Sequence, residues 1–486
     1  MTTPRFAAAA TLLILLLGNG TAPADPLRLP DLGSPTDTLL STAEKRALGQ
    51  AFMRYVRKTL PVSDDAVLND YVESLGRQIV RADGGSSGNF HFFVVEQPEV
   101  NAFAGPSGHI GVFSGLILSS ETEAELAAVI AHEVAHVSQD HLMRSFDDQR
   151  KMALPATALL IAAAVLGAQV DGNVAQAAIA GVQAAAVQRR INFTRANEEE
   201  ADRIGMATLA AAGFDPFAMP GFFQKLARST RIYETGAPEF LRPHPVTTTR
   251  IADALGRATQ LGTRQRPDSL RYHLARANLR QRAHHRAEKA VDDFKARLAG
   301  GRYRNETAER YGYALALARA DRLNDALREV ERLLEAHPSQ MELLVLRAEI
   351  YRRGGKPDKA IQELKGAVGL SPSSWPLRQA YAQALLAANR PGEALRTLES
   401  VAAYHTDTAP LYALMADVAG KAGKPGLYAR YRAEYLYLQG DLEPAIRQLQ
   451  AGLRQPDLDF PTAAKLKVRL EELQEQQRAE KDKPWR

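Results

Sequence analysis

The carboxyl-terminal half of this 486-residue chain repeats itself, and the repeat restricts the fold more than any other feature of the sequence. Small residues recur at intervals of 34 positions, at Ala326, Ala360 and Ala394. Prolines follow at the same interval, at Pro338 and Pro372. This period fits one pair of antiparallel helices, because a small residue lets two helices pack closely and a proline stops the second helix. Such pairs stack into an elongated solenoid.

The repeat pattern resembles the tetratricopeptide repeat. Three units are clear, and we expect a degenerate capping repeat on either side of them. The three units cover 307–340, 341–374 and 375–408, and the flanking segments cover 268–306 and 409–460. We therefore predict an all-α repeat domain over 263–474, followed by a charged tail over 475–486. A solenoid of this kind normally binds peptides or proteins on its concave face; a purely structural stack is the alternative.

The amino terminus has the shape of an export signal. Arg5 precedes an apolar run over 6–17, and Ala22-Pro23-Ala24 forms an A-x-A cleavage site. The run of twelve residues is shorter than the roughly twenty that a membrane-spanning helix needs, although an uncleaved anchor is the alternative. We predict a signal peptide over 1–24, cleaved after Ala24, and a periplasmic protein. The chain has no cysteine, which excludes a lipoprotein and disulfide bonds.

The charge pattern argues against nucleic acid as a partner. The formal net charge is +5, but Lys and Arg alternate with Asp and Glu along almost the whole chain. No basic stripe emerges, so the charged residues are best explained as a solvated mixed surface.

Two apolar segments, 153–167 and 174–187, flank Asp171-Gly172-Asn173 and are typical of a short helical hairpin. Neither segment is long enough to span a bilayer comfortably. Burial inside the domain is the favoured interpretation. The alternative is a peripheral membrane contact through 153–187.

The region over 25–262 mixes helical and β-type patterns. A capping box at Ser41 and Glu44 opens one helix, and a second helix fits 65–80. Short β-type runs follow at 90–96 and 109–113, separated by an irregular segment over 101–108. Ser120 and Glu123 are expected to form a second capping box, at the start of an apolar helix. The prediction is an α+β, mainly helical domain over 25–262.

That apolar helix carries the sequence His132-Glu133-Val134-Ala135-His136, which matches the pattern H-E-x-x-H. Residues four apart share a helical face, so both imidazoles can reach one metal ion. Glu133 is rotated by about 100° from His132 and can address a metal-bound water instead. Two histidines that flank a glutamate at this spacing are poorly explained as structural residues. We predict His132 and His136 as ligands and Glu133 as the catalytic base.

A catalytic zinc needs a third protein ligand and an open position. The segment Asn197-Glu198-Glu199-Glu200-Ala201-Asp202 supplies the candidates. Glu198 and Asp202 are four apart and share a helical face, whereas Glu199 and Glu200 point elsewhere. Spacing alone does not choose Glu198 over Glu199 or Glu200.

The two motifs together resemble the gluzincin metallopeptidases, which include the CAAX prenyl proteases, the HtpX membrane protease and the periplasmic BepA-like proteases. The pattern of that family is H-E-x-x-H followed by E-x-x-A-D. The resemblance implies a zincin-type domain with one Zn²⁺ per chain, Glu198 as the third ligand, and Asp202 as the partner that orients His132. The carboxyl-terminal repeats favour the BepA-like branch.

Two further parts of the chain resemble the family. Asn101-Ala102-Phe103 and Gly108-His109-Ile110 resemble its substrate-side edge strand, on which an extended peptide could add by main-chain hydrogen bonds. His244-Pro245, followed by Arg250-Ile251, resembles a segment near the active site. This implies that His244 either stabilises the oxyanion or fills the fourth zinc position at rest. A solvent-exposed loop histidine is the alternative.

These observations predict a periplasmic zinc endopeptidase that acts on misfolded or stalled outer-membrane proteins. The repeats would recruit these unfolded clients or an outer-membrane assembly machine. A periplasmic chaperone or adaptor with a latent metal site is the alternative. A membrane-embedded prenyl protease would need several spans of about 20 residues, which the sequence lacks.

Overall fold

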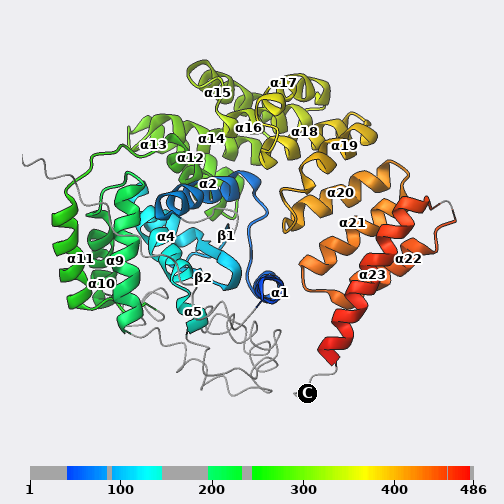
Figure 1. Cartoon of the computed structure of the whole chain (residues 1–486). Helices are drawn as coiled ribbons and strands as arrows, with labels where there is room; N and C mark the ends of the chain where they lie inside the picture. Colours follow the sequence, from blue (N-terminus) through cyan, green and yellow to red (C-terminus); the bar gives the residue numbers. More distant parts are fainter. Residues whose placement is uncertain (1–40, 85–89, 145–194, 233–243, 457, 482–486) are drawn as a thin grey trace, which may run out of the picture.

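The structure is a computed structural model, and it describes residues 41–84, 90–144, 195–232, 244–456 and 458–481. The predicted signal peptide (1–24) and the apolar hairpin with its membrane contact (153–187) lie outside the described residues. The predicted class is confirmed: an α+β, mainly helical domain is followed by all-α repeats (Figure 1).

A three-stranded sheet forms the centre of the first domain. Its strands are β1 (His91–Val95), β2 (Ala102–Ala104) and β3 (His109–Phe113), in the order β1-β3-β2. β1 pairs parallel to β3, with His91 opposite His109, and β2 pairs antiparallel to β3. A short 3-10 turn, η3 (Pro106–Gly108), joins β2 to β3.

This strand order corrects the prediction for Gly108, His109 and Ile110. They lead into β3, which is the middle strand, so both of its edges are already paired. The residue pattern missed β2, because three residues are too few for a visible alternation of polar and apolar side chains. Only the family resemblance of Asn101-Ala102-Phe103 pointed to an edge strand there. The strand at the edge of the sheet next to β3 is β2.

Helices cover both faces of the sheet. Phe93, Phe103 and Phe113 project to one face and pack against α1 (Thr42–Thr59). Phe92 and Val112 project to the other face, toward α2 (Ala66–Asp83) and α4 (Glu123–Ser138). This alternation follows from the two-residue period of a strand.

The helix starts are set by caps, as predicted, with one correction. The Ser41–Glu44 capping box is present at α1, and Asp65 caps α2. The expected Ser120–Glu123 box is wrong, because the Ser120 hydroxyl donates to the main-chain oxygen of Leu116 at the end of α3 (Ser114–Ser119). Thr122 caps α4 instead. Ser120 and Thr122 both carry a hydroxyl, so the sequence pattern predicted the cap two residues too early.

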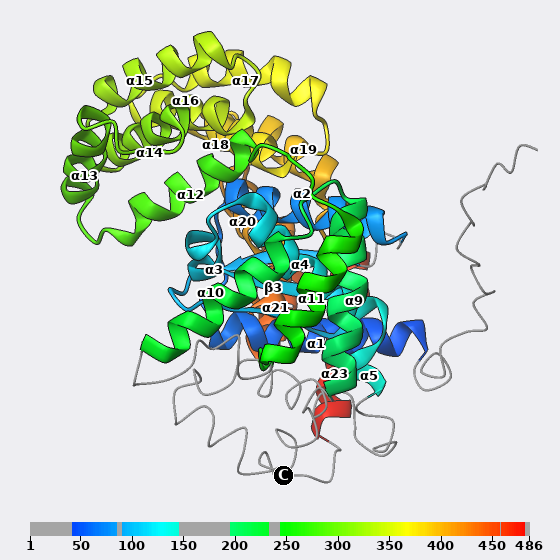
Figure 2. The ribbon, with the colours of Figure 1, turned by 90° about the vertical axis from the view of Figure 1, so that its left-hand side faces the viewer.

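Three helices complete this domain, namely α9 (Arg195–Ala211), α10 (Ala218–Ile232) and α11 (Thr248–Leu261). They lie beside α4 in Figure 2. α9 can approach α4 closely because of Gly205, where an added Cβ would lie 3.0 Å from the main-chain oxygen of Ala131 and from the nitrogen of His132. A short helix, α5 (His141–Arg144), follows α4.

The predicted repeats are confirmed as antiparallel helix pairs. The three clear units contain α14 (Glu306–Arg319) with α15 (Leu323–Ala336), α16 (Met341–Arg353) with α17 (Pro357–Leu370), and α18 (Trp375–Ala387) with α19 (Pro391–Ala402). The flanking helices are α12 (Leu270–Ala283), α13 (Ala287–Ala299), α20 (Ala409–Lys421), α21 (Pro425–Leu438), α22 (Leu442–Leu453) and α23 (Phe460–Lys481). The predicted tail beginning at residue 475 is partly wrong, because α23 continues through it to Lys481.

The repeats curve around the first domain, so that α1 and α2 lie on the inside of the curve (Figure 1). Ala66, at the start of α2, is buried in the same core as Trp375 of α18. The Arg54 guanidinium of α1 donates to the Tyr437 hydroxyl of α21 over 2.8 Å. Part of the concave face that we expected to receive partners is therefore occupied by this chain itself.

α12 belongs to both cores. Tyr272 and Leu279 are buried with the first domain, whereas Leu274 and Ala277 are buried with the repeats. The Tyr272 hydroxyl also donates to the main-chain oxygen of Ser120 over 2.8 Å. The two domains thus share one helix, although the break predicted at 262–263 does fall in the linker between α11 and α12.

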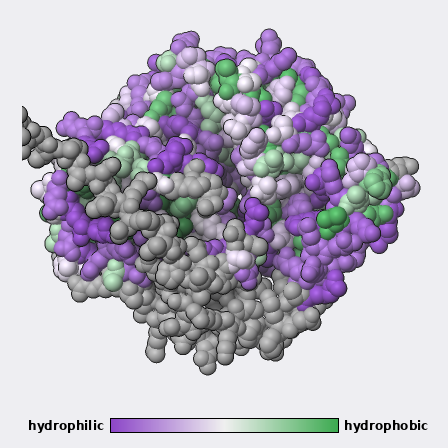
Figure 3. All heavy atoms as spheres, in the orientation of Figure 1, coloured by the Kyte–Doolittle hydropathy of each residue, from purple (hydrophilic) through white to green (hydrophobic). Residues whose placement is uncertain are grey.

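The visible surface is mostly hydrophilic, with hydrophobic side chains in small separate groups over the repeats (Figure 3). Leu370, Tyr404 and Phe460 are the most exposed of the large hydrophobic residues. Within the described part of the chain, no helix combines the length and the apolar character needed to cross a membrane.

Candidate metal centre

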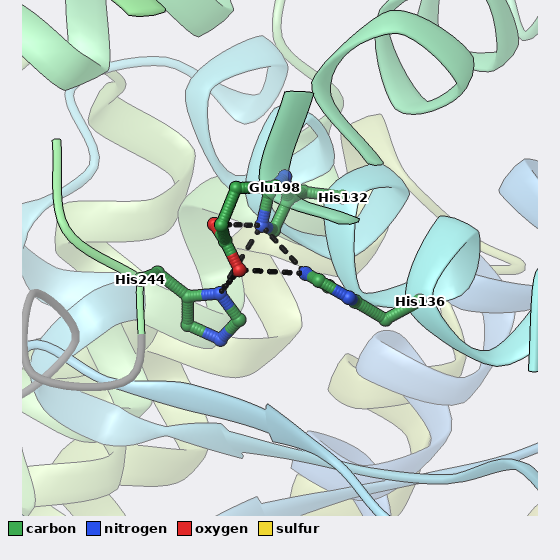
Figure 4. Close-up of side chains that lie close together, drawn as sticks. All are labelled: His132, His136, Glu198 and His244. Carbon is green, nitrogen blue, oxygen red and sulfur yellow. Dashed lines mark hydrogen bonds and ion pairs between the residues drawn. The ribbon is translucent and has the colours of Figure 1, made fainter. Parts of the chain in front are cut away.

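Four buried side chains converge between α4, α9 and the segment that precedes α11 (Figure 4). They are His132, His136, Glu198 and His244, and one potential ligand atom of each lies within 4.8 Å of the others. The Nε2 atoms of His132 and His136 are 3.0 Å apart. Glu198 Oε2 is 3.5 Å from His132 Nε2, and Glu198 Oε1 is 3.4 Å from His136 Nε2. The side chains therefore point at one common position.

The local structure explains this convergence. His132 and His136 are one helical turn apart on α4, so their rings project from the same face. Glu198 lies in the first turn of α9, which Gly205 allows to pack directly against α4.

The structure distinguishes the three glutamates that spacing left open. Glu198 is 2% exposed and faces both histidines, whereas Glu199 is exposed. The Glu200 carboxylate lies 3.0 Å from Nε2 of His141, on the outer side of His136. Of the three, Glu198 is the one placed among the converging atoms. Burial alone would raise the pKa of Glu198, but His244, His132 and His136 hold it well below its ordinary value.

Asp202 lies one turn beyond Glu198 and contacts the far side of the His132 ring. Its Oδ1 is 3.0 Å from His132 Nδ1, which leaves Nε2 directed at the common position. Burial alone would lower the pKa of His132, but hydrogen bonds and charge from Asp202 and Glu198 outweigh burial and raise that pKa to about 9. A carboxylate on the outer nitrogen is the usual way of orienting a ligating histidine.

Arg250 of α11 is a site residue to which the sequence assigned no role. Its guanidinium donates to both oxygens of Asp202, over 2.7 and 2.8 Å, and lies 2.9 Å from Glu198 Oε2. It also donates to the main-chain oxygen of Pro245 over 2.8 Å, and so fixes the segment that carries His244. Arg250-Ile251 had stood out only through family resemblance, and an arginine on a helix otherwise gives no signal of burial.

His141 is a second residue that sequence reasoning missed. Its Nδ1 is 2.8 Å from His136 Nδ1, and its Nε2 is the atom that meets Glu200. His141 therefore contacts the outer nitrogen, Nδ1, of His136, just as Asp202 contacts Nδ1 of His132. The only available signal was a histidine five positions after His136, which is too common to interpret.

Glu133 lies next to the converging atoms and is 1% exposed. Its Oε1 is 3.5 Å from Nε2 of His244. Burial raises the pKa of Glu133, although His244 and His132 and the backbone of Ala104 act in the opposite direction. The edge strand β2 packs against α4, the helix that carries Glu133.

His244 is part of this cluster and is 3% exposed, so the alternative of a solvent-exposed loop histidine is wrong. Its Nδ1 is 2.9 Å from Glu198 Oε1 and 3.3 Å from His132 Nε2. The sequence could not show this burial, because the residues that contact His244, namely Glu198 and His132, lie 46 and 112 positions earlier in the chain.

His109 does not join the cluster, although the resemblance placed it at the substrate edge. Its Nδ1 is 2.8 Å from the main-chain oxygen of Pro106, and its ring stacks on His91 with centroids 5.0 Å apart. Burial, with a smaller contribution from His91, lowers the pKa of His109 to about 3. Gly108 and Ile110 are likewise buried in the sheet.

The donor set fits a zinc ion. Two imidazole nitrogens and one carboxylate oxygen are the ligands of a catalytic zinc with three protein ligands, and a fourth position completes the tetrahedron. Burial lowers the pKa of His136 well below its ordinary value, although Glu198 acts in the opposite direction. Hard cations such as Mg²⁺ and Ca²⁺ prefer sets made of oxygen.

Comparisons with known proteins agree with this geometry. The family model described as peptidase family M48 matches residues 66–258, and a tetratricopeptide repeat model matches 351–418. The beta-barrel assembly-enhancing protease of Escherichia coli is 35% identical over 333 residues, which are 68% of each chain. A Vibrio cholerae protein provisionally given the same name is 41% identical over 279 residues, so the match spans 57% of each chain.

Two further similarities are more distant. The metalloprotease LoiP of Escherichia coli is 31% identical over 161 residues, which are 33% of this chain and 58% of LoiP. A crystal structure of a tetratricopeptide repeat protein from Parabacteroides merdae is 14% identical, with a TM-score of 0.28, over 57% of this chain and 99% of that one.

Proposed function

The chain belongs to peptidase family M48, and from this membership we propose that it is a zinc-dependent endopeptidase with one catalytic zinc ion. His132, His136 and Glu198 would hold the ion. The observation that carries the proposal is that a carboxylate from α9 meets both imidazoles of the H-E-x-x-H helix at one buried position.

When bound, the zinc ion would polarise the scissile carbonyl and make the attacking water more acidic. Glu133 would take a proton from that water and pass it to the leaving amine. A raised pKa suits both steps, because a carboxylate of ordinary acidity holds a proton too weakly to deliver it. Asp202 and Arg250 would keep the His132 ring and Glu198 in place during the reaction.

We propose that His244 fills the fourth position at rest. Its Nδ1 lies among the ligand atoms, as near to Glu198 and His132 as those residues are to each other. Catalysis needs that position for water, so the resting enzyme would be weakly active until substrate or a partner displaces His244. The rival role, stabilisation of the oxyanion, would require His244 to stay beside the site during the reaction.

The substrates we propose are misfolded or stalled outer-membrane proteins in the periplasm. The names of the relatives from Escherichia coli and Vibrio cholerae support this class of client. An unfolded segment would add to β2, since β2 lies at the sheet edge and packs against α4, the helix that carries Glu133. Contact with an outer-membrane assembly machine would use those surfaces of the repeats that α1 and α2 leave uncovered.

The central experiment compares the mature protein with Glu133→Gln on an unfolded outer-membrane β-barrel protein, with zinc content measured on the same samples. The variant should keep its zinc and lose hydrolysis, because the change removes the base and none of the ligands. Undiminished cleavage by Glu133→Gln would refute the proposed mechanism.

The chaperone alternative gives a different result in the same samples. If the chain acts as an adaptor with a latent site, Glu133→Gln should support assembly of the β-barrel protein as well as the unmodified chain does. Fractionation of cells would test the periplasmic location and the cleavage after Ala24.

A further inference from the structure

A second group of potential ligands lies where the first domain meets the repeats. It consists of His91 at the start of β1, His109 at the start of β3, and Asp407 in the loop between α19 and α20. One ligand atom of each lies within 4.8 Å of the others. His109 is buried, and the other two side chains are half-buried. We propose that these three residues bind a second, structural Zn²⁺ ion that fastens the repeat domain to the sheet.

The strand pairing fixes the two imidazoles side by side. His91 and His109 are direct partners in the parallel β1–β3 register, and their rings are 25° from parallel. The backbone of α1 also lies close to His109, since a Cβ added at Gly49 would lie 3.1 Å from His109 Cε1. The His109 ring is thus held in place before any ion binds, with the His91 ring beside it.

The hydrogen bond of His109 selects the nitrogen that would bind the ion. Nδ1 lies 2.8 Å from the main-chain oxygen of Pro106, and only a protonated Nδ1 can donate to a carbonyl. Nε2 then carries the lone pair, and it makes no hydrogen bond to any described residue. A backbone carbonyl behind the ring is a common outer partner of a zinc-binding histidine.

The spacing of the three groups fits an ion better than it fits direct bonds. No hydrogen bond or ion pair joins the Asp407 carboxylate to either imidazole in the described structure, yet these atoms lie within 4.8 Å. Two ligands of a tetrahedral zinc are about 3.3 Å apart, given bonds of about 2.0–2.1 Å. A small rotation of the half-buried His91 and Asp407 side chains closes that difference. Water would complete the tetrahedron.

Arg57 of α1 holds the Asp407 loop in position. Its guanidinium donates to the main-chain oxygens of Asp407 and Leu438, and not to the carboxylate. The positive charge of Arg57 opposes cation binding, while the charge of Asp407 favours it. A rival explanation is that Asp407 serves only as a nearby counter-charge for Arg57, in which case no ion binds here.

Zinc content of the full chain separates these explanations. The test uses Glu133→Gln, which prevents self-cleavage, after the metal has been stripped by chelation and the protein reloaded with Zn²⁺ alone. We expect about two zinc ions per chain, and about one after either His91→Asn or Asp407→Asn is added. The matched control is His273→Asn, since His273 lies 3.8 Å from a single carboxylate, Asp268, and should leave the count at two.

Hydrogen exchange tests the fastening itself. At free zinc about ten times the dissociation constant, the loop over 403–408 should exchange about tenfold more slowly than without zinc. Asp407→Asn should abolish this effect. A zinc count that neither His91→Asn nor Asp407→Asn lowers relative to Glu133→Gln would overturn the second site. This inference does not depend on the proposed catalysis, because loss of the catalytic zinc would lower the count by one in every variant alike.

Discussion

Replacing Arg250 by methionine should be among the most damaging single changes in the first domain. Arg250 is 2% exposed and connects α11 to two acidic residues of α9, Asp202 and Glu198. Methionine keeps much of the volume of the arginine stem but removes every donor. The two carboxylates would then stay buried, with imidazoles as their remaining partners.

The size of the effect follows from this burial. Removing one partner of a buried ion pair costs about 3–5 kcal/mol, because the remaining charge is left uncompensated in a medium of low dielectric constant. The metal-free protein should lose stability of this order around α9 and α11. Zinc should bind about 10–100-fold more weakly, as is usual when the groups that orient the ligands are changed.

Native-state hydrogen exchange of the α9 and α11 amides measures this loss, because it reports local opening without assuming that the whole chain unfolds at once. Zinc affinity can be measured on the same protein by competition with a chelator. Arg390→Met is the matched control, since the Arg390–Glu393 pair is exposed and should contribute nothing measurable.

A double variant then tests the proposed pairing. Arg250→Met with Asp202→Asn should cost clearly less than the sum of the single changes, because the second change removes the stranded charge. A loss below about 1 kcal/mol in Arg250→Met, or strict additivity, would refute the reasoning.

Three further predictions concern the site and the domain boundary. Glu198→Gln should lose zinc measured by metal analysis, whereas Glu199→Gln should keep it; the reverse result would mean that the ligand assignment is wrong. His244→Ala should raise basal proteolysis if His244 blocks the fourth position, whereas a loss of roughly 10²–10³-fold would indicate an oxyanion role. A fragment ending at residue 262 should unfold at lower temperature than one ending at 285, because only the longer one retains Tyr272; equal midpoints would show that α12 is dispensable.

Much of the architecture could be predicted because its signals are local. The Ser41–Glu44 capping box lies within one turn of helix, and the repeats restate one pattern every 34 residues. The pair His132 and His136 is also a local signal, since one helical turn separates the two residues. The gluzincin-like domain and its ligand set needed the family resemblance as well, because spacing alone did not select Glu198.

What escaped prediction depends on contacts between distant parts of the chain. Arg250 became a site residue only because α11 packs beside α9, 48 positions earlier in the sequence. β2 is recognisable only because it pairs with β3, since a strand of three residues has almost no pattern of its own. His244 is buried for the same kind of reason, since its ring lies against Glu198, 46 positions earlier, and His132, 112 positions earlier.

The inner face of the repeats shows how one such contact changes a functional conclusion. From the repeat pattern alone, a concave face is a free binding surface. In the structure, Ala66 is buried against the repeats and Arg54 bonds to Tyr437, so that α1 and α2 take up part of that face. Recruitment through the repeats would therefore use the surfaces that α1 and α2 leave uncovered, because contacts such as those of Arg54 and Arg57 already hold the repeats against the first domain.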